Sequence, residues 1–192
     1  MNSSKLHKLV GVAALAGLGF ILMSFEVPII PAFPFLKLDA SDLVILIGVL
    51  LYGFSGGVEV AVIRSLLHFI VTGASVVNLI GDTTSVLASI AFAAPLAIMI
   101  RKNYDWKRAA IGLGIGIVAL TVVMSVLNYL VIMPMYLAVF GLNLHMSTLR
   151  YVLIGVVPFN LIKGAVLTGL FLVLARMLSP WLAHRRAASG NN

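Results

Sequence analysis

The sequence predicts an all-α integral membrane protein with six transmembrane helices and both termini cytoplasmic. Hydrophobic residues make up 61% of the 192 residues, whereas charged residues make up only 10%. Soluble domains contain about 45–50% apolar and about 25% charged residues, so this chain could not cover its surface with polar groups in water. Its apolar residues also form uninterrupted runs, and a run of about 20 such residues can cross a bilayer.

The breaks between the apolar runs separate the expected helices. Three prolines between Pro28 and Pro34 exclude a helix after the first run, because proline lacks a backbone N–H. Asp39 to Asp42 can cap the second helix, and Gly53 to Gly57 forms a turn after it. The predicted helices are 6–24, 42–55, 58–72, 82–100, 109–139 and 150–178. They form one membrane domain, 1–184, and the polar residues 185–192 are expected to be a disordered cytoplasmic tail.

The basic residues predict the orientation. With the N-terminus inside, nine Lys and Arg residues lie on the cytoplasmic side, and only Lys37 and Arg150 lie outside. The nine are Lys5, Lys8, Arg101, Lys102, Lys107, Arg108, Arg176, Arg185 and Arg186. This distribution accounts for the net charge of +7 without a nucleic-acid partner. The loop 25–41, the polar connection 73–82 and the segment 140–149 are then expected to face outward.

Several classes of chemistry find no support in the sequence. The chain has no cysteine, which excludes disulfides and thiolate metal sites, and it has no Walker A, Ser-His-Asp or HExxH pattern. The glycines Gly112, Gly114 and Gly116 lie inside an apolar helix, where close helix packing explains them. All six acidic residues lie near predicted helix ends or in loops, which argues against a proton- or sodium-coupled pump. We therefore expect no metal, no cofactor and no energy source within the chain.

The polar residues that remain inside the predicted spans are candidate site residues. Lys163 lies about 20 Å into the last helix, and a charge near a helix centre costs about 2.5–3.5 kcal/mol. Asn160 shares its face, three residues earlier, and Pro158 leaves a nearby carbonyl without its usual donor. These groups predict either a ligand site or a clamp between helices in which Lys163 pairs with Asp82.

Three further polar residues have less decisive patterns. Asn128 can bind a ligand or hold two helices together. Arg64 and His68 are four residues apart and resemble a proton relay, but the spans supply no central carboxylate. A structural pair is the preferred interpretation, with Glu59 as the expected partner of Arg64.

Three segments resemble a known family. They are Phe35-Leu-Lys-Leu-Asp-Ala-Ser-Asp42, Leu127-Asn-Tyr-Leu-Val-Ile-Met-Pro-Met-Tyr136 and Val157-Pro-Phe-Asn-Leu-Ile-Lys-Gly164. They are similar to segments of the RibU family, the riboflavin-binding S-components of energy-coupling factor (ECF) vitamin transporters. The resemblance covers nearly the whole chain, and the first and third segments are its most specific parts.

The resemblance implies a substrate pocket near the outer face, covered by the first loop. It implies pocket roles for Asn128, Asn160 and Lys163, and for Asp82 where the family usually carries a glutamate. Asn and Lys side chains suit the carbonyl and N–H groups of a flavin ring. We expect Asp82 and Thr84 to meet the ribityl hydroxyls, and Phe35, Leu36 and Tyr129 to cover the ring.

The resemblance also implies partners. S-components capture the vitamin outside and release it inside when they associate with a transmembrane coupling protein and two ABC-type ATPases. The small-residue stripe of the first helix, formed by Ala13, Ala14, Ala16 and Gly17, corresponds to the docking surface of the family. The expected setting is the cell membrane, with riboflavin as transported substrate rather than cofactor.

Two other interpretations stay open at this point. The chain could be an S-component for a different vitamin, or a self-sufficient small-solute transporter, channel or membrane enzyme.

Overall fold

The computed structural model describes residues 3–101, 104–141 and 145–189. The described chain is almost entirely helical, with one short antiparallel hairpin in which Val27 pairs with Leu38 and Pro28 with Lys37. The elements are α1 (Ser3–Met23), β1 (Val27–Pro28), β2 (Lys37–Leu38), α2 (Ser41–Val71), α3 (Val76–Ile100), α4 (Trp106–Leu127), the π-helix η1 (Asn128–Ile132), α5 (Met133–Phe140), α6 (Thr148–Tyr151), the π-helix η2 (Val152–Val156) and α7 (Val157–Ser189).

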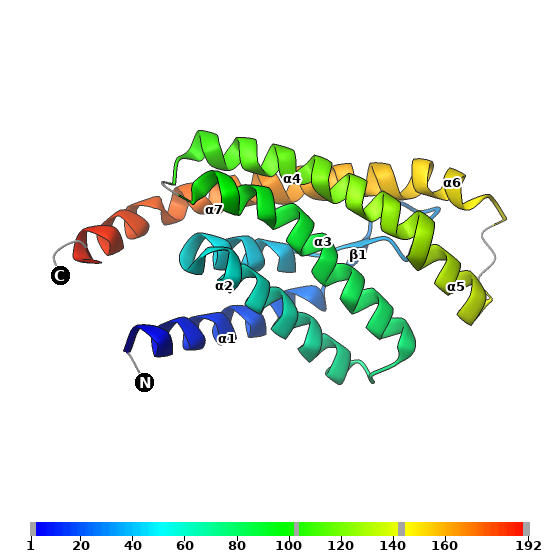
Figure 1. The fold of residues 1–192 in the computed structure, drawn as a ribbon, viewed down its shortest axis with the longest axis horizontal. Coiled ribbons are helices and arrows are strands. Elements are labelled where there is room, and N and C mark those ends of the chain that lie inside the picture. Colours follow the sequence, from blue (N-terminus) through cyan, green and yellow to red (C-terminus); the bar gives the residue numbers. More distant parts are fainter. Residues whose placement is uncertain (1–2, 102–103, 142–144, 190–192) are drawn as a thin grey trace.

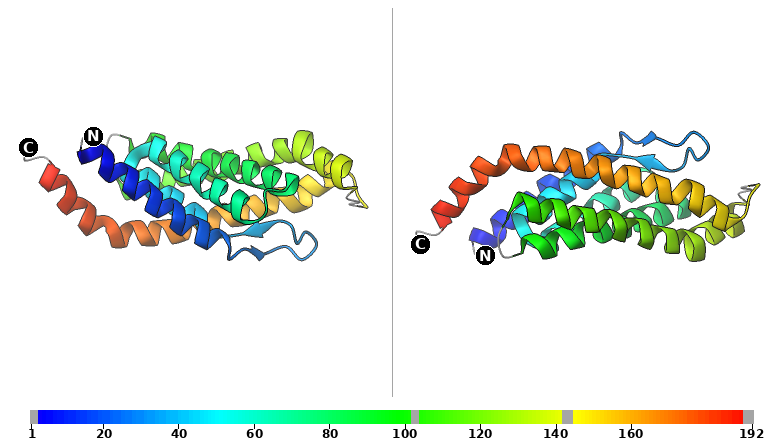
Figure 2. Two further views of the ribbon diagram at one scale, coloured as in Figure 1. Left: turned by 90° about the horizontal axis from the view of Figure 1, so that it is seen from below. Right: turned by 90° about the horizontal axis from the view of Figure 1, so that it is seen from above.

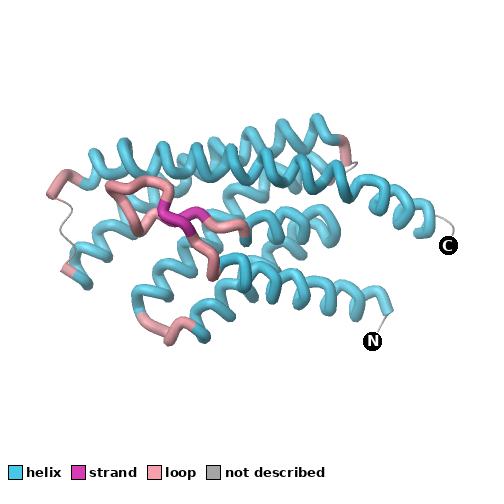
Figure 3. Tube along the Cα trace, turned by 180° about the vertical axis from the view of Figure 1, so that it is seen from behind, coloured by secondary structure: helices cyan, strands magenta, loops and turns pink. Residues whose placement is uncertain are grey.

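The helices form an elongated bundle and run roughly along its long axis (Figure 1; Figure 2). Helix α2 packs against α1 and α3, while α4 packs against α3 and α7. Both termini lie at the same end of the bundle (Figure 1), where α3 ends and α4 begins. The β1–β2 hairpin lies across one face of the bundle, toward the other end (Figure 3). The two termini thus share one side, as the charge distribution requires, and the cytoplasmic assignment of that side stays a prediction.

Five of the described helical stretches are long and apolar enough to cross a membrane: Lys5–Met23, Ser41–Val71, Val76–Ile100, Trp106–Ala138 and Thr148–Met177. The sequence prediction of six came from separating 42–55 from 58–72. In the structure both segments belong to α2, which is interrupted at Gly53. The part before Gly53 is about 18 Å long at 1.5 Å per residue, shorter than the roughly 30 Å of hydrocarbon. The count of six spans therefore stays a prediction, whereas the break is observed.

At Gly53 the chain folds back on itself. Arg64 reaches Asp42 across 22 residues of the same element, with Nη1 and Oδ1 3.4 Å apart, which a continuous helix would prevent. The Gly53 backbone has φ 74° and ψ −176°, a conformation essentially restricted to glycine. The two parts of α2 pack closely on either side of the turn. A Cβ added to Gly57 would lie only 2.3 Å from Val49 Cγ2. The sequence predicted a turn from Gly53 to Gly57, and in the structure only Gly53 departs from helical geometry.

Other boundaries also differ from the sequence prediction. Helix α3 begins at Val76, six residues before the predicted start, because the Ser75 side chain caps it by accepting the Asn78 N–H. Asp82 therefore lies within α3 and is buried, not in an outward-facing connection. Helix α7 is described to Ser189, and residues 190–192 lie outside the described residues. The division into a domain 1–184 and a disordered tail 185–192 stays a prediction.

Each π-helix lies just before a proline. Helix η1 precedes Pro134 and η2 precedes Pro158. A proline cannot donate to the carbonyl four residues earlier, so the neighbouring N–H groups bond one residue farther back. The Met133 N–H donates to the Asn128 carbonyl, and the Val157 N–H donates to the Val152 carbonyl. The disturbance expected around Pro158 is therefore a wider helical turn.

The turn in α2 predicts a position-specific glycine requirement. Gly53→Ala should reduce the free energy of unfolding by about 1–3 kcal/mol, because alanine is strained at this φ and ψ. Gly114→Ala is the matched control, since its added Cβ meets no atom within 4 Å inside regular α4. The control should leave stability unchanged or raise it by up to about 1 kcal/mol. Equal thermal unfolding of both variants in detergent would contradict this interpretation of Gly53.

Candidate functional site

A polar cavity of about 420 Å³ lies between the first loop and the helices. Its volume falls in the range of about 300–1,000 Å³ usual for small-molecule sites. The walls come from the end of α1, from the loop after it and from α2, α3, α4, η1, α5 and α7. The lining residues are Met23, Glu26, Phe35, Leu36, Lys37, Asp39, His68, Val77, Asn78, Gly81, Asp82, Thr84, Ser85, Ala88, Met124, Asn128, Ile132, Tyr136, Phe159, Asn160 and Lys163.

The cavity brings together seven of the eight residues predicted to bind substrate. They are Phe35, Leu36, Asp82, Thr84, Asn128, Asn160 and Lys163. Tyr129 is the exception, because it does not line the cavity and is 47% exposed. Tyr129 directly follows Asn128 and therefore points about 100° away from it around the helix. Residues four and eight positions after Asn128 point to the same face as Asn128. Ile132 and Tyr136 accordingly line the cavity where Tyr129 was expected.

Lys163 is buried and faces two carboxylates. Its Nζ lies 2.8 Å from Asp42 Oδ2 and 3.9 Å from Asp39 Oδ2. The sequence offered Asp82 as the partner of Lys163 in a helix clamp, and that pairing is wrong. Asp42 lies in the first turn of α2 and Asp39 just before it, so the ion pair joins the start of α2 to the second turn of α7. Lys163 therefore holds two elements together while it lines the cavity.

Arg64 is fully buried and shares the Asp42 carboxylate with Lys163. Its Nη1 donates to Asp42 Oδ1 over 3.4 Å and also to the Ser41 hydroxyl. Its Nη2 donates to Ser85 Oγ over 2.8 Å, which reaches α3. The expected partner Glu59 instead forms an ion pair with Lys8 of α1, with Nζ and Oε1 2.7 Å apart. The prediction of a structural role for Arg64 agrees with this geometry, but the predicted partner was wrong.

Asp82 presents an unpaired oxygen at the cavity wall. Its Oδ1 lies 2.8 Å from His68 Nδ1, which joins α3 to the second part of α2. Its Oδ2 is buried and has no hydrogen-bond partner among the described residues. A buried acceptor without a donor is costly, by about 1–3 kcal/mol. A ligand hydroxyl that entered the cavity could donate to this oxygen.

The two asparagines are held by their own helices. Asn128 Nδ2 donates to the Met124 carbonyl and Asn160 Nδ2 donates to the Val156 carbonyl, each over 2.8 Å. Asn128 Oδ1 also accepts from the Tyr151 hydroxyl over 3.4 Å. These bonds fix both amides beside the π-helices, and π-turns are frequent at functional sites.

The first loop is anchored over the cavity by aromatic packing. The rings of Phe33 and Phe35 lie 5.3 Å and 5.8 Å from the ring of Tyr151, centroid to centroid. Gly155 leaves room for this contact, because a Cβ there would come within 2.9 Å of the Phe33 ring. An ion pair between Lys37 and Glu26 joins the two sides of the hairpin. The loop that three prolines keep from forming a helix is thus an ordered roof.

The small-residue stripe of α1 is only partly available for docking. Ala13 and Ala14 are exposed, and Gly17 is half-buried with open space beside it. Ala16 is completely buried in the bundle core, so its predicted place in a docking surface is wrong. The remaining three residues lie on a face that carries exposed apolar side chains, including Val10 and Ile21.

The sequence did not reveal several residues of the site. It indicated helix capping for Asp39, which lines the cavity, and for Asp42, which pairs with Lys163 behind it, although a buried lysine requires a carboxylate partner. Phe159 lies within the motif that contains Asn160 and Lys163, so its position was a usable signal. His68 had a signal in its spacing from Arg64, but its partner Asp82 lies on another helix. Glu26 and Asn78 carried no distinguishing pattern.

The sequence matches a known protein family over most of its length. Residues 7–175 match the family described as "ECF transporter, substrate-specific component". The chain is 35% identical to the riboflavin transporter FmnP of Bacillus subtilis (strain 168), over 96% of this chain and 98% of that protein. It is 33% identical to the riboflavin transporter RibU of Streptococcus thermophilus, over 88% of this chain and 81% of that protein.

A solved structure has a similar fold. It is described as "Structure and mechanism of the S component of a bacterial ECF transporter". The two folds agree with a TM-score of 0.79 at 28% sequence identity, over 93% of this chain and 98% of that chain.

The shared Asp42 carboxylate predicts a large difference between two acidic residues. Asp42→Asn leaves Lys163 and Arg64 without their common partner and should reduce stability by about 3–5 kcal/mol. Glu59→Gln removes the partially exposed pair with Lys8 and should change stability by about 1 kcal/mol or less. Thermal or denaturant unfolding of the purified variants measures the difference. Similar losses for both would show that the buried network is not what holds α2 to α7.

Proposed function

The chain belongs to the substrate-specific component family of ECF transporters, and on that basis we propose that it binds riboflavin for import across the cell membrane. Members of this family are transport subunits and not enzymes, in agreement with the prediction from sequence. The family match spans residues 7–175 and therefore includes every residue that lines the cavity. The relatives named riboflavin transporters supply the substrate for this proposal.

The observation that carries the proposal is the polar end of the cavity. Asn128, Asn160 and Lys163 line one cavity and come from two helices. The pyrimidine edge of a flavin carries two carbonyl acceptors on either side of an N–H donor. An asparagine amide can both donate and accept, and the lysine ammonium donates to a carbonyl. These groups match the hydrogen-bonding pattern of the flavin edge.

The remaining walls suit the other parts of riboflavin. The unpaired Asp82 Oδ2 can accept a hydrogen bond from a ribityl hydroxyl, and Thr84 lies close by in α3. Phe35 and Leu36 of the first loop line the cavity and can cover the apolar ring, with Tyr136 and Phe159 in place of Tyr129. A ligand in this position would be enclosed by the first loop and the helices that line the cavity.

Energy for transport would come from partner subunits. We propose that the exposed face of α1, around Ala13, Ala14 and Gly17, docks onto a transmembrane coupling protein that carries two ABC-type ATPases. The docking proposal is supported because this face is apolar and is flat at Gly17, where an added Cβ would meet no described atom within 4 Å. Small residues allow two membrane helices to approach closely.

Removal of the Lys163 ammonium tests the proposed substrate. Lys163→Ala should weaken riboflavin binding by more than tenfold, because a desolvated donor to the flavin is lost. Lys8→Ala, whose side chain does not line the cavity, should bind riboflavin with unchanged affinity. Isothermal titration of each purified variant gives the affinities, and circular dichroism shows that each variant is folded. Equal riboflavin affinity in both folded variants would remove Lys163 from the site, and binding of thiamine or folate in place of riboflavin would contradict the proposed substrate.

The docking proposal predicts a defect in assembly without a defect in binding. Gly17→Leu should abolish co-purification with the coupling protein and leave riboflavin affinity unchanged, because the side chain projects away from the bundle. Gly169→Leu is the matched control on α7, where an added Cβ also meets no atom within 4 Å. The control variant should assemble normally. Normal assembly of the Gly17 variant would place the docking surface elsewhere.

A further inference from the structure

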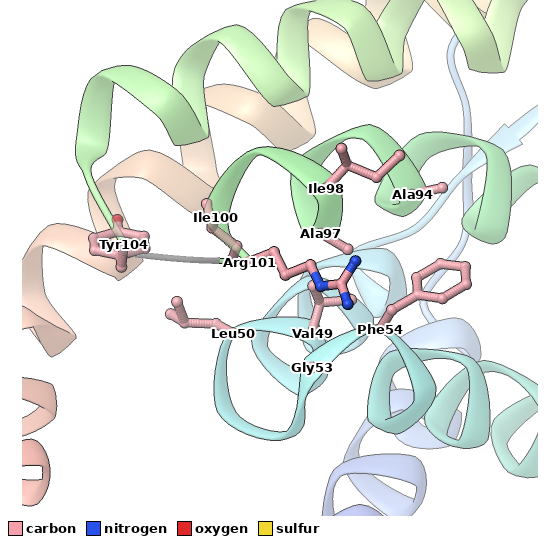
Figure 4. Close-up of a pocket in the computed structure, with 10 residues that line it drawn as sticks. All are labelled: Val49, Leu50, Gly53, Phe54, Ala94, Ala97, Ile98, Ile100, Arg101 and Tyr104. Carbon is pink, nitrogen blue, oxygen red and sulfur yellow. The ribbon is translucent and has the colours of Figure 1, made fainter.

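A second cavity, of about 580 Å³, lies near the end of the bundle where both termini are found. It is separate from the polar cavity and shares none of its lining residues. One wall is the turn of α2 around Gly53 and the other is the last part of α3 (Figure 4). The lining residues are Val49, Leu50, Gly53, Phe54, Ala94, Ala97, Ile98, Ile100, Arg101 and Tyr104.

The walls of this cavity are apolar except at its edge. Ala94 and Ala97 are small, so α3 leaves open space opposite Val49 and Leu50. Ile98 is 72% exposed and Phe54 is also exposed, so the cavity opens to the perimeter of the bundle. In a bilayer this opening faces lipid chains, and an acyl chain is the apolar molecule present there in greatest amount.

A single cation defines the polar edge. The Arg101 side chain extends from the end of α3 across the cavity toward the turn of α2 (Figure 4). It forms no hydrogen bond or ion pair with another described residue, and the Tyr104 ring lines the same edge. The nearest acid in sequence, Asp105, is engaged in capping α4, where it accepts from the Lys107 N–H. The guanidinium can therefore receive an anion from outside the chain, and its fork of donors suits a phosphate.

We propose that this cavity binds an anionic phospholipid, with its phosphate on Arg101 and an acyl chain along Val49, Leu50 and Ala97. Basic pockets between transmembrane helices on the cytoplasmic side are known to take anionic lipid headgroups. The charge of this end of the bundle agrees, since α1 and α4 both begin there (Figure 1) and carry Lys5, Lys107 and Arg108 in their first turns. A neutral phospholipid would offer the same chains but no net charge for Arg101.

The position of the cavity indicates what the lipid would do. The lining residues come from the part of α2 before Gly53, from Phe54 directly after the turn and from the end of α3. A bound chain would fill the space between these three segments and stabilise the folded-back arrangement of α2. The inference does not depend on the transported substrate, because the two cavities have no residue in common.

Lipid binding to the full purified chain tests the proposal. Native mass spectrometry would compare phosphatidylglycerol with phosphatidylcholine of the same acyl chains, and glycerol phosphate would serve as the headgroup alone. Wild-type protein should retain phosphatidylglycerol in preference to both other molecules. Arg101→Gln should weaken phosphatidylglycerol binding by about fivefold, the effect expected for one basic residue near a membrane surface. Arg108→Gln, which removes an equal charge outside the cavity, should change it by less than about twofold.

Ala97→Leu provides a second variant, because its side chain would occupy the space of the acyl chain while Arg101 is kept. It should weaken binding of phosphatidylglycerol, and helical circular dichroism would confirm that both variants are folded. Equal retention of the two lipids by wild-type protein, or equal losses in the Arg101 and Arg108 variants, would overturn the proposal. Unchanged lipid affinity in the Arg101 variant together with loss of assembly with partner subunits would also overturn it, in favour of a protein segment in the cavity.

Discussion

The Asp42 carboxylate lies between two buried cations, and much of the bundle depends on this shared contact. Lys163 of α7 approaches one carboxylate oxygen and Arg64 the other, while Ser89 of α3 donates to Asp42 Oδ1 as well. Asp39 adds a second negative charge near Lys163, so two cations meet two carboxylates away from water. An unpaired charge in this environment would be strongly unfavourable. The network therefore fixes the start of α2, its folded-back second part, α3 and α7 relative to one another.

This arrangement also shapes the polar cavity. Lys163 can line the cavity with its charge kept because Asp42 and Asp39 neutralise it from behind. The π-turns before Pro134 and Pro158 lie beside Asn128 and Asn160, whose amides are held by carbonyls of their own helices. Polar groups fixed in this way need little rearrangement when a ligand enters, which lowers the entropy lost on binding. The roof formed by Phe33 and Phe35 completes the enclosure through its contact with Tyr151.

The sequence predicted the helical membrane architecture and seven of the 21 residues that line the cavity, because apolar runs and isolated polar residues are strong signals in hydrocarbon. It assigned Lys163 and Arg64 to the wrong partners, since an ion pair between distant helices depends on how the chain folds back at Gly53. It included Tyr129 and Ala16 because they adjoin Asn128 and Gly17 in the sequence. Neighbours on a helix point in different directions, so only the packing shows that Tyr129 faces outward and Ala16 faces the core. The start of α3 was misplaced because the cap at Ser75 outweighs the polar composition of the segment after it.

A structure of the purified chain with riboflavin bound would test the account most directly. The pyrimidine edge of the isoalloxazine ring should lie within hydrogen-bond distance of Asn160 and Lys163, with the ribityl chain toward Asp82 and the first loop over the ring. The contact between Lys163 and Asp42 should be kept in the complex. Riboflavin bound outside the cavity of about 420 Å³, or with its ribityl chain toward Lys163 and its ring toward Asp82, would contradict it.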